Sequence, residues 1–182
     1  MVKIYTRRGD DGSTGLSSGK RLRKNETVFE VLGDIDEAQA CLGELIELSR
    51  KARLTKVITR SLDQAQQSLF SFGAHVSVTP GWEDGRVPSE AIAEIERNID
   101  ILESRLPALK NFILASGPTV VTRFHLCRAV VRKLERHIIA LAKEQNVAPT
   151  VLAYLNRLSD FLFVAARNAA KKTKTKETIW RG

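Results

Sequence analysis

The 182-residue chain has little that could form a disulfide framework, hold a metal ion or cross a membrane. It contains two cysteines, one methionine and three histidines, and aromatic residues make up 6% of it. Cys41 and Cys127 fall on apolar helical positions without metal-ligand spacing, so we expect buried free thiols. No apolar run approaches the roughly 18 residues of a membrane span, and the N-terminus lacks a secretory pattern. These absences predict a cytoplasmic protein, or a mitochondrial one if a transit peptide has been removed.

Acidic side chains are also in short supply. The chain has 29 basic against 21 acidic side chains, a net charge of +8. This balance favours polyanionic partners such as nucleotide phosphates, nucleic acid or an acidic membrane surface. Part of the excess lies in residues 171–182, which we expect to form a flexible basic tail. The length suits a single domain that buries about 70% of its unfolded surface.

Strand-like alternation is almost absent, whereas apolar residues recur at helical spacing in five segments. The first begins at Thr27, where Thr27 and Glu30 suggest a capping box. The others span about 55–78, 89–107, 119–143 and 149–170, and turn-forming residues at 79–85 predict an exposed loop. The sequence therefore predicts an all-α antiparallel five-helix bundle over residues 25–170, preceded by a glycine-containing loop over residues 1–24.

Residues 124–136 carry the most informative pattern. Arg128, Arg132 and Arg136 recur every four residues, so on a helix they form one cationic stripe, here called the arginine ridge. An adjacent apolar stripe places at least one of these arginines near the buried edge. Like charges at this spacing disfavour an isolated helix by about 0.2–0.5 kcal/mol per pair, and burial adds a desolvation cost. Either the ridge has an anionic partner, or it is a solvated basic face with carboxylates across the bundle.

Three other polar residues adjoin the apolar faces of helices. Asp36 lies at the edge of the first helical stripe, where a carboxylate needs a cation or hydrogen-bond donors, and the arginine ridge is the obvious supplier. Asn156 adjoins the fifth apolar face, where its amide must find either a ligand or a structural hydrogen bond. His75 has no second ligand three or four residues away, so we expect a structural histidine.

Residues 3–24 form a strongly basic segment punctuated by glycines. Closely spaced glycine, serine and threonine let backbone amides and hydroxyls turn towards phosphate oxygens, and flanking cations supply counter-charge. The segment does not match the Walker pattern, and no strand leads into a helix. We expect either a phosphate-binding loop folded over another part of the protein or a disordered basic arm.

Taken together, these segments resemble the PduO-type ATP:cob(I)alamin adenosyltransferases, also called corrinoid adenosyltransferases. Residues 4–14 are similar to the family's Thr-Lys-Thr-Gly-Asp-x-Gly loop, and residues 128–136 to its arginine helix. Residues 154–163 are similar to its Asn-Arg-Leu-Ser-Asp signature, and residues 33–37 to its Gly-x-x-Asp-Glu element. The motifs follow the family order and cover nearly the whole chain.

The resemblance implies a homotrimer with ATP between neighbouring subunits, the N-terminal loop of one chain covering the arginine helix of the next. It implies an enzyme in which the cobalt of cob(I)alamin attacks the 5′ carbon of ATP, expels triphosphate and forms adenosylcobalamin. Magnesium would bridge the ATP phosphates without dedicated protein ligands. Expected partners are ATP, cob(I)alamin, an unidentified cob(II)alamin reductase and an adenosylcobalamin-dependent enzyme as a further candidate, with neither nucleic acid nor membrane.

The resemblance also implies roles for individual residues. Arg128 would pair with Asp36 of a neighbouring chain, and Arg132 would serve both catalysis and nucleotide binding. Phe112 matches the aromatic residue that displaces the lower axial ligand of cobalamin. The residues implied for the nucleotide site are Thr6, Arg7, Arg8, Gly9, Thr14, Lys20, Lys24, Arg132, Lys133, Glu135, Arg136 and Asn156.

The chain departs from the family pattern at three places. Residues 7–8 are Arg-Arg instead of Lys-Thr, Lys133 replaces an arginine, and residues 115–117 replace Pro-Gly-Gly. Lysine lacks the bidentate fork of arginine, so we expect nucleotide affinity or pose to differ. The family's tail often closes over the corrin with an aromatic residue, for which Trp180 is a candidate.

Two alternative functions remain at this point. One is a family member that binds ATP or cobalamin without turnover. The other is a basic helical module that binds nucleic acid, although no nucleic-acid motif or aromatic platform supports it.

Overall fold

The computed structural model describes residues 3–78 and 89–181, and the loop predicted at residues 79–85 lies outside them. Five helices dominate the described residues, which confirms the predicted fold class. They are α1 (Thr27–Lys51), α2 (Lys56–Val78), α3 (Ser89–Glu103), α4 (Thr119–Leu141) and α5 (Pro149–Lys172).

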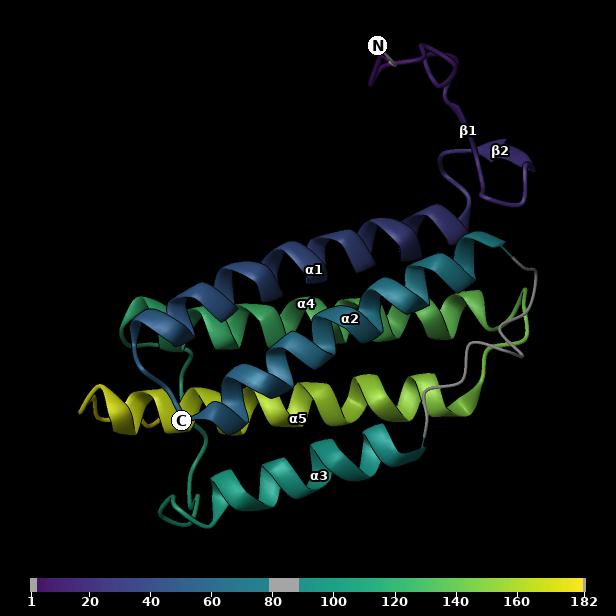
Figure 1. The fold of residues 1–182 in the computed structure, drawn as a ribbon. Coiled ribbons are helices and arrows are strands. Elements are labelled where there is room, and N and C mark those ends of the chain that lie inside the picture. Colours follow the sequence, from purple (N-terminus) through teal and green to yellow (C-terminus); the bar gives the residue numbers. More distant parts are fainter. Residues whose placement is uncertain (1–2, 79–88, 182) are drawn as a thin grey trace.

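Consecutive helices run in opposite directions along one bundle axis (Figure 1). Helix α4 packs against both α1 and α5, α1 packs against α2, and α3 packs against α5. The α3–α5 pair runs in the same direction, so the bundle is not antiparallel at every contact (Figure 1). None of the described helices is long and apolar enough to span a membrane. This packing leaves one long face of α4 free of helical cover, and that face carries the arginine ridge.

The predicted apolar stripes form the core, but the predicted capping box at the start of α1 is wrong. Glu26 occupies the N-cap position and makes no side-chain capping hydrogen bond. Thr27 is the first helical residue, and its Oγ1 donates to Glu144 Oε1 at 2.8 Å. The hydroxyl therefore links the start of α1 to the segment after α4. Of the two free thiols, Cys127 is buried as predicted, whereas Cys41 is only half-buried.

The N-terminal segment contains a short antiparallel hairpin that the sequence did not predict. Strand β1 (Ser13–Gly15) pairs with β2 (Arg21–Arg23), and Thr14 lies opposite Leu22. Leu16 and Leu22 pack against the core, and Ser18 N donates to the Ser77 carbonyl oxygen at 3.2 Å. These contacts attach the hairpin at the junction of α1 and the end of α2.

The C-terminal residues do not match the predicted flexible tail. The tail was expected from residue 171, but α5 continues to Lys172. Beyond it, Ile179 forms a β-bridge with Ile113, and Leu114 N donates to the Thr178 carbonyl oxygen at 2.8 Å. The apolar residues near the end of the chain suit this extended pairing better than a solvated tail, so the segment lies against the α3–α4 connection.

Candidate active site

The predicted arginine ridge lies along α4, and its first member is the least exposed. Arg128 is half-buried, and its Nε is shielded from solvent without a hydrogen-bond partner among residues 3–78 and 89–181. Its guanidinium lies 5.8 Å from the centre of the Phe163 ring. Arg132 and Arg136 are exposed, and Arg136 Nη1 donates to the Arg132 carbonyl oxygen at 3.1 Å. The ion pairs that α4 makes within the described residues come from its other basic residues.

The environment of Arg128 is electrostatically unfavourable. Burial, followed by the charge of Arg132, lowers the pKa of Arg128. An arginine stays protonated in proteins. The guanidinium of Arg128 therefore keeps its charge, and its partial burial beside Arg132 costs free energy. An incoming carboxylate or phosphate would relieve the cost. The alternative of a solvated basic face therefore fits Arg132 and Arg136 but not Arg128.

Lys133, expected at the nucleotide site, instead contacts two carboxylates of α1. Its Nζ lies 3.0 Å from Asp34 Oδ1 and also donates to Glu37 Oε2. These hydrogen bonds, Glu37 first and Asp34 second, raise the pKa of Lys133. His137, one turn further along α4, places its Nδ1 2.5 Å from Asp34 Oδ2. Two basic residues of α4 thus surround a single carboxylate of α1.

Asp34 is the site residue that sequence reasoning missed. Its exposed fraction is only 5%, and a buried carboxylate requires cations or donors. The pattern held a clue, because Asp34 lies three residues after Val31 and four before Ala38, inside the apolar stripe.

Asp36, by contrast, is exposed and forms no ion pair within the described residues. Within the described residues of one chain the ridge does not supply its cation, and the pairing with Arg128 of a neighbouring chain stays a prediction. Asp36 lines a groove of about 450 Å³ between α1 and α2, together with the exposed ring of Phe70.

Helices α4 and α5 are joined beside the ridge by a polar link. Asn156 Nδ2 donates to Glu135 Oε1 at 3.3 Å, and Arg157 Nη1 donates to Asn156 Oδ1 at 3.0 Å. Arg157 Nε also donates to Glu96 Oε1 at 2.8 Å, and this bond raises the pKa of Arg157. The structural hydrogen bond expected for Asn156 is present, and it brings Asn156 and Glu135 together.

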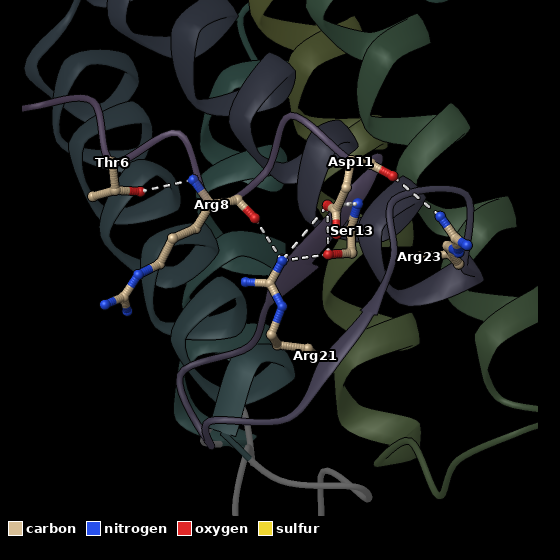
Figure 2. A network of polar contacts seen from close by, with 6 residues as sticks. All are labelled: Thr6, Arg8, Asp11, Ser13, Arg21 and Arg23. Carbon is tan, nitrogen blue, oxygen red and sulfur yellow. Dashed lines mark hydrogen bonds and ion pairs between the residues drawn. The ribbon is translucent and has the colours of Figure 1, made fainter.

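Figure 2 shows the polar network that shapes the N-terminal loop. Asp11 Oδ1 accepts from Ser13 N at 2.9 Å and from Ser13 Oγ at 2.7 Å, and these bonds lower the pKa of Asp11. Arg21 donates to Ser13 Oγ and to the Arg8 carbonyl oxygen, the latter at 2.6 Å. Arg23 Nη1 donates to the Asp11 carbonyl oxygen at 3.1 Å. Two arginines outside the predicted set therefore shape the loop.

The predicted phosphate-binding residues of this loop are mostly exposed. Arg7 has a positive φ of 61°, and Arg8 N donates to Thr6 Oγ1 at 3.5 Å. A Cβ on Gly9 would lie 3.3 Å from the Ser13 carbonyl oxygen, a tight contact that favours glycine at this turn. No hydrogen bond or ion pair joins the described part of the loop to α4 or α5, and the loop extends beyond the start of α1 (Figure 1). Within one chain, the loop and the arginine ridge therefore lie apart.

Phe112 is presented by the α3–α4 connection with 78% of its surface exposed. Its carbonyl oxygen accepts from Trp180 N at 2.8 Å, and the two rings meet edge to face with centroids 6.3 Å apart. Arg167, almost fully buried on α5, hydrogen-bonds to the two segments that carry these rings. Its Nε donates to Glu177 Oε1, and its Nη2 donates to the Pro107 carbonyl oxygen, each at 2.8 Å.

A buried histidine beside Arg128 makes stability depend on pH. Burial, then the charge of Arg128, lowers the pKa of His125 below its model-compound value of 6.5. Below that pH the unfolded chain binds a proton that the folded chain resists, so stability is lost as pH falls. We expect thermal unfolding to show a slope of up to about 1.4 kcal/mol per pH unit from this group. The slope should flatten in His125→Phe but persist in His75→Gln, a change at an exposed histidine; an unchanged slope in His125→Phe would contradict the assignment.

The described residues contain no group of three or more histidine, cysteine, aspartate or glutamate side chains placed to hold a metal ion. His75 Nδ1 lies 2.7 Å from the Ser71 carbonyl oxygen, as expected for a structural histidine.

The fold and the site define a helical bundle that offers an unpaired arginine ridge and a separate basic loop to a polyanion. Comparison with known proteins assigns the family: the cobalamin adenosyltransferase model matches residues 4–169. The chain belongs to the cobalamin adenosyltransferase family.

Individual relatives agree over nearly the full length. A corrinoid adenosyltransferase from Bacillus subtilis is 37% identical over 91% of this chain and 86% of its own length. Human corrinoid adenosyltransferase MMAB is 35% identical over 99% of this chain and 74% of its own. A solved PduO-type ATP:corrinoid adenosyltransferase from Lactobacillus reuteri, a phenylalanine-to-alanine variant complexed with cobalamin and ATP, superposes with a TM-score of 0.88 at 30% identity. The superposition covers 99% of this chain and 100% of the chain in the solved structure.

Proposed function

We propose that the chain transfers the 5′-deoxyadenosyl group of ATP to the cobalt of cob(I)alamin, releasing triphosphate. The observation that carries this proposal is an arginine ridge that forms no ion pair with residues 3–78 and 89–181, on a chain of this family. The cobalt electron pair forms a bond to C5′ of ATP, and the C5′–O bond breaks with its electrons leaving on triphosphate. No protein nucleophile is needed. The protein must hold C5′ in line with cobalt and stabilise negative charge on the leaving oxygen.

The exposed part of the ridge suits the leaving group. Arg132 and Arg136 present two cations one turn apart, and the N-terminal loop adds Arg7, Arg8 and Lys24. Asn156 and Glu135, already joined, offer an amide and a carboxylate for the nucleoside end. Lys133 reaches a phosphate only by leaving Asp34 and Glu37, so it contributes less than the arginines. Magnesium bound together with ATP would offset the negative charge of the phosphates.

A complete site requires a second copy of the chain. No hydrogen bond or ion pair joins the described part of the loop to the ridge of its own chain, and Arg128 and Asp36 each lack an ionic partner in the described residues. A cyclic trimer places the loop of one chain over α4 of the next and brings Asp36 to Arg128. This arrangement neutralises the desolvated guanidinium and leaves Arg132 and Arg136 for triphosphate.

Phe112 would contact the lower face of the corrin. It is exposed, and a β-bridge at Ile113 holds its backbone. An aromatic ring in place of the lower axial ligand lowers the filled cobalt orbital and makes reduction easier. A cob(II)alamin reductase supplies the reduced substrate, and an adenosylcobalamin-dependent enzyme consumes the product. A reducing compartment such as the cytoplasm suits this chemistry.

The direct test is anaerobic incubation of the purified protein with chemically reduced cobalamin, ATP and magnesium. We expect the light-sensitive spectrum of adenosylcobalamin and equimolar triphosphate. ATP or cobalamin binding without product would instead indicate a non-catalytic family member. Salt-sensitive retention of RNA or DNA without product would indicate the nucleic-acid-binding alternative.

Trp180 offers a test of the Phe112 arrangement. In Trp180→Ala the edge-to-face contact is lost, and aromatic contacts of this kind are worth about 0.5–1.5 kcal/mol. We expect kcat to fall about three- to tenfold while the fold and ATP affinity are retained. Arg181→Ala, at the adjacent exposed position, serves as the control. An unchanged kcat in Trp180→Ala would show that Phe112 is held without this ring.

A further inference from the structure

Helices α1, α3 and α5 finish at the same end of the bundle (Figure 1), and this end carries cations that the proposed adenosyl transfer does not use. They surround a cavity of about 390 Å³ between the α1–α2 turn and the ends of α3 and α5, here called the basic end pocket. Its apolar wall includes Leu54 and Ile58, and no carboxylate of the described residues lines it. The cations that line it are Arg53, Arg105, Lys171, Lys172 and Lys174.

Helix ends account for only part of this charge. A helix C-terminus carries about −0.5 charge, so three ends supply about −1.5 against five cationic side chains. Two side chains of α5 already donate hydrogen bonds to carbonyl oxygens at the end of α3. Lys171 Nζ donates to the Arg105 carbonyl oxygen at 2.5 Å, and Asn168 Nδ2 donates to the Leu102 carbonyl oxygen at 3.2 Å. The side chains left without an ion pair or hydrogen bond to any described residue are those of Arg53, Arg105, Lys172 and Lys174.

Two of these cations occupy backbone positions that favour glycine. Arg53 and Lys174 have φ values of 52° and 55°, and each follows the C-cap of a helix. The hydrogen bond from Leu54 N to the Ser49 carbonyl oxygen at 3.0 Å closes one turn. An equivalent bond from Thr175 N at 2.9 Å closes the other. Such turns commonly place glycine at the left-handed residue. Each turn thus carries a cationic side chain where glycine would cost less, and the first turn also packs Leu54 against the core.

We propose that the basic end pocket binds a phosphate-bearing small molecule with an apolar group, of the nucleoside diphosphate class. The volume falls within the usual range for small-molecule sites, about 300–1,000 Å³. The unpaired cations hold the phosphates, and Leu54 and Ile58 contact the apolar group. The pocket shares no residue with the arginine ridge, the N-terminal loop or Phe112, so this ligand binds in addition to the ATP that is the adenosyl donor.

Hydrogen–deuterium exchange of the intact protein resolves the two sites by peptide. We expect ADP to protect residues 53–58 and 168–174, and inorganic pyrophosphate to do so only at higher concentration, because it lacks the apolar group. The proposal would be overturned if ADP protected only residues 6–24 and 128–136, or if it protected neither these residues nor those of the basic end pocket. Equal potency of the two anions would overturn the role of the apolar wall.

The strained positions allow a variant that removes charge without harming the fold. Arg53→Gly combined with Lys174→Gly relieves both positive φ values, so we expect a Tm at or above that of the parent. Protection of the pocket peptides should need about tenfold more ADP. The pair Lys51→Gln and Arg60→Gln removes the same charge from exposed positions outside the lining and should leave the ADP dependence unchanged. If both double variants needed the same increase in ADP concentration, binding would depend on the overall charge, and this result would contradict a defined site.

Discussion

Replacing Arg132 with alanine should lower kcat/KM for adenosyl transfer about 100- to 1,000-fold, the effect typical of losing one preorganised charge at a leaving group. Arg132 is exposed on α4 and makes no ion pair with the described residues, so its charge is free to meet triphosphate. Steady-state rates with cob(I)alamin and varied ATP measure the effect. Thermal unfolding should change little, because an exposed side chain contributes little to packing.

Arg132→Lys and Arg60→Ala complete this experiment. Lysine retains the charge but not the bidentate fork, so an intermediate loss is expected. Arg60, exposed on α2, provides a matched change of charge away from the ridge and should leave kcat/KM unchanged. Full activity in Arg132→Ala would remove this residue from the site.

The second large effect concerns Arg128 and Asp36, which the proposed trimer brings together. Arg128→Ala and Asp36→Ala should each weaken trimer formation and catalysis, and the double variant should be little worse than either single change. We expect a coupling free energy of about 1–3 kcal/mol, because the two residues act as one pair. Sedimentation velocity at several protein concentrations measures the assembly, and the transfer rate measures the site.

Arg123 is the control for this pair, since it lies on the same helix but its Nη2 contacts Glu44 Oε1 of the same chain at 3.0 Å. Arg123→Ala should leave the trimer intact. Exchanging the charges, as Arg128→Asp with Asp36→Arg, should recover part of the assembly lost in the single changes. Additive losses for Arg128→Ala and Asp36→Ala would contradict a direct pair.

Helical spacing alone predicted the bundle, because apolar stripes on α1, α2, α4 and α5 can be buried only against one another. Separation of the loop from the ridge could not be predicted from periodicity. It depends on Leu16 and Leu22 attaching the hairpin at the start of α1. The docked C-terminus was missed because composition emphasised the lysines, whereas Ile179 and the buried Arg167 direct the pairing.

The site was predictable where residues of one helix share a face, as in the arginine ridge. It was less predictable where helices meet. The family resemblance implied a nucleotide contact for Lys133, yet in the structure its Nζ contacts Asp34 of α1. The difference between Asp34 and Asp36 is about 200° of rotation around α1, which places one carboxylate inside the bundle and the other at its surface.

The central claim is that each active site combines the N-terminal loop of one chain with the arginine ridge of another. Arg8→Ala/Lys24→Ala damages the loop and Arg132→Ala damages the ridge, so trimers of either variant alone should be inactive. Co-expression with two affinity tags, followed by tandem purification, gives mixed trimers. In each mixed trimer one of the three interfaces joins an undamaged loop to an undamaged ridge, so we predict about a third of parental adenosyl transfer. Activity no higher than that of the separate variants would contradict a site shared between chains.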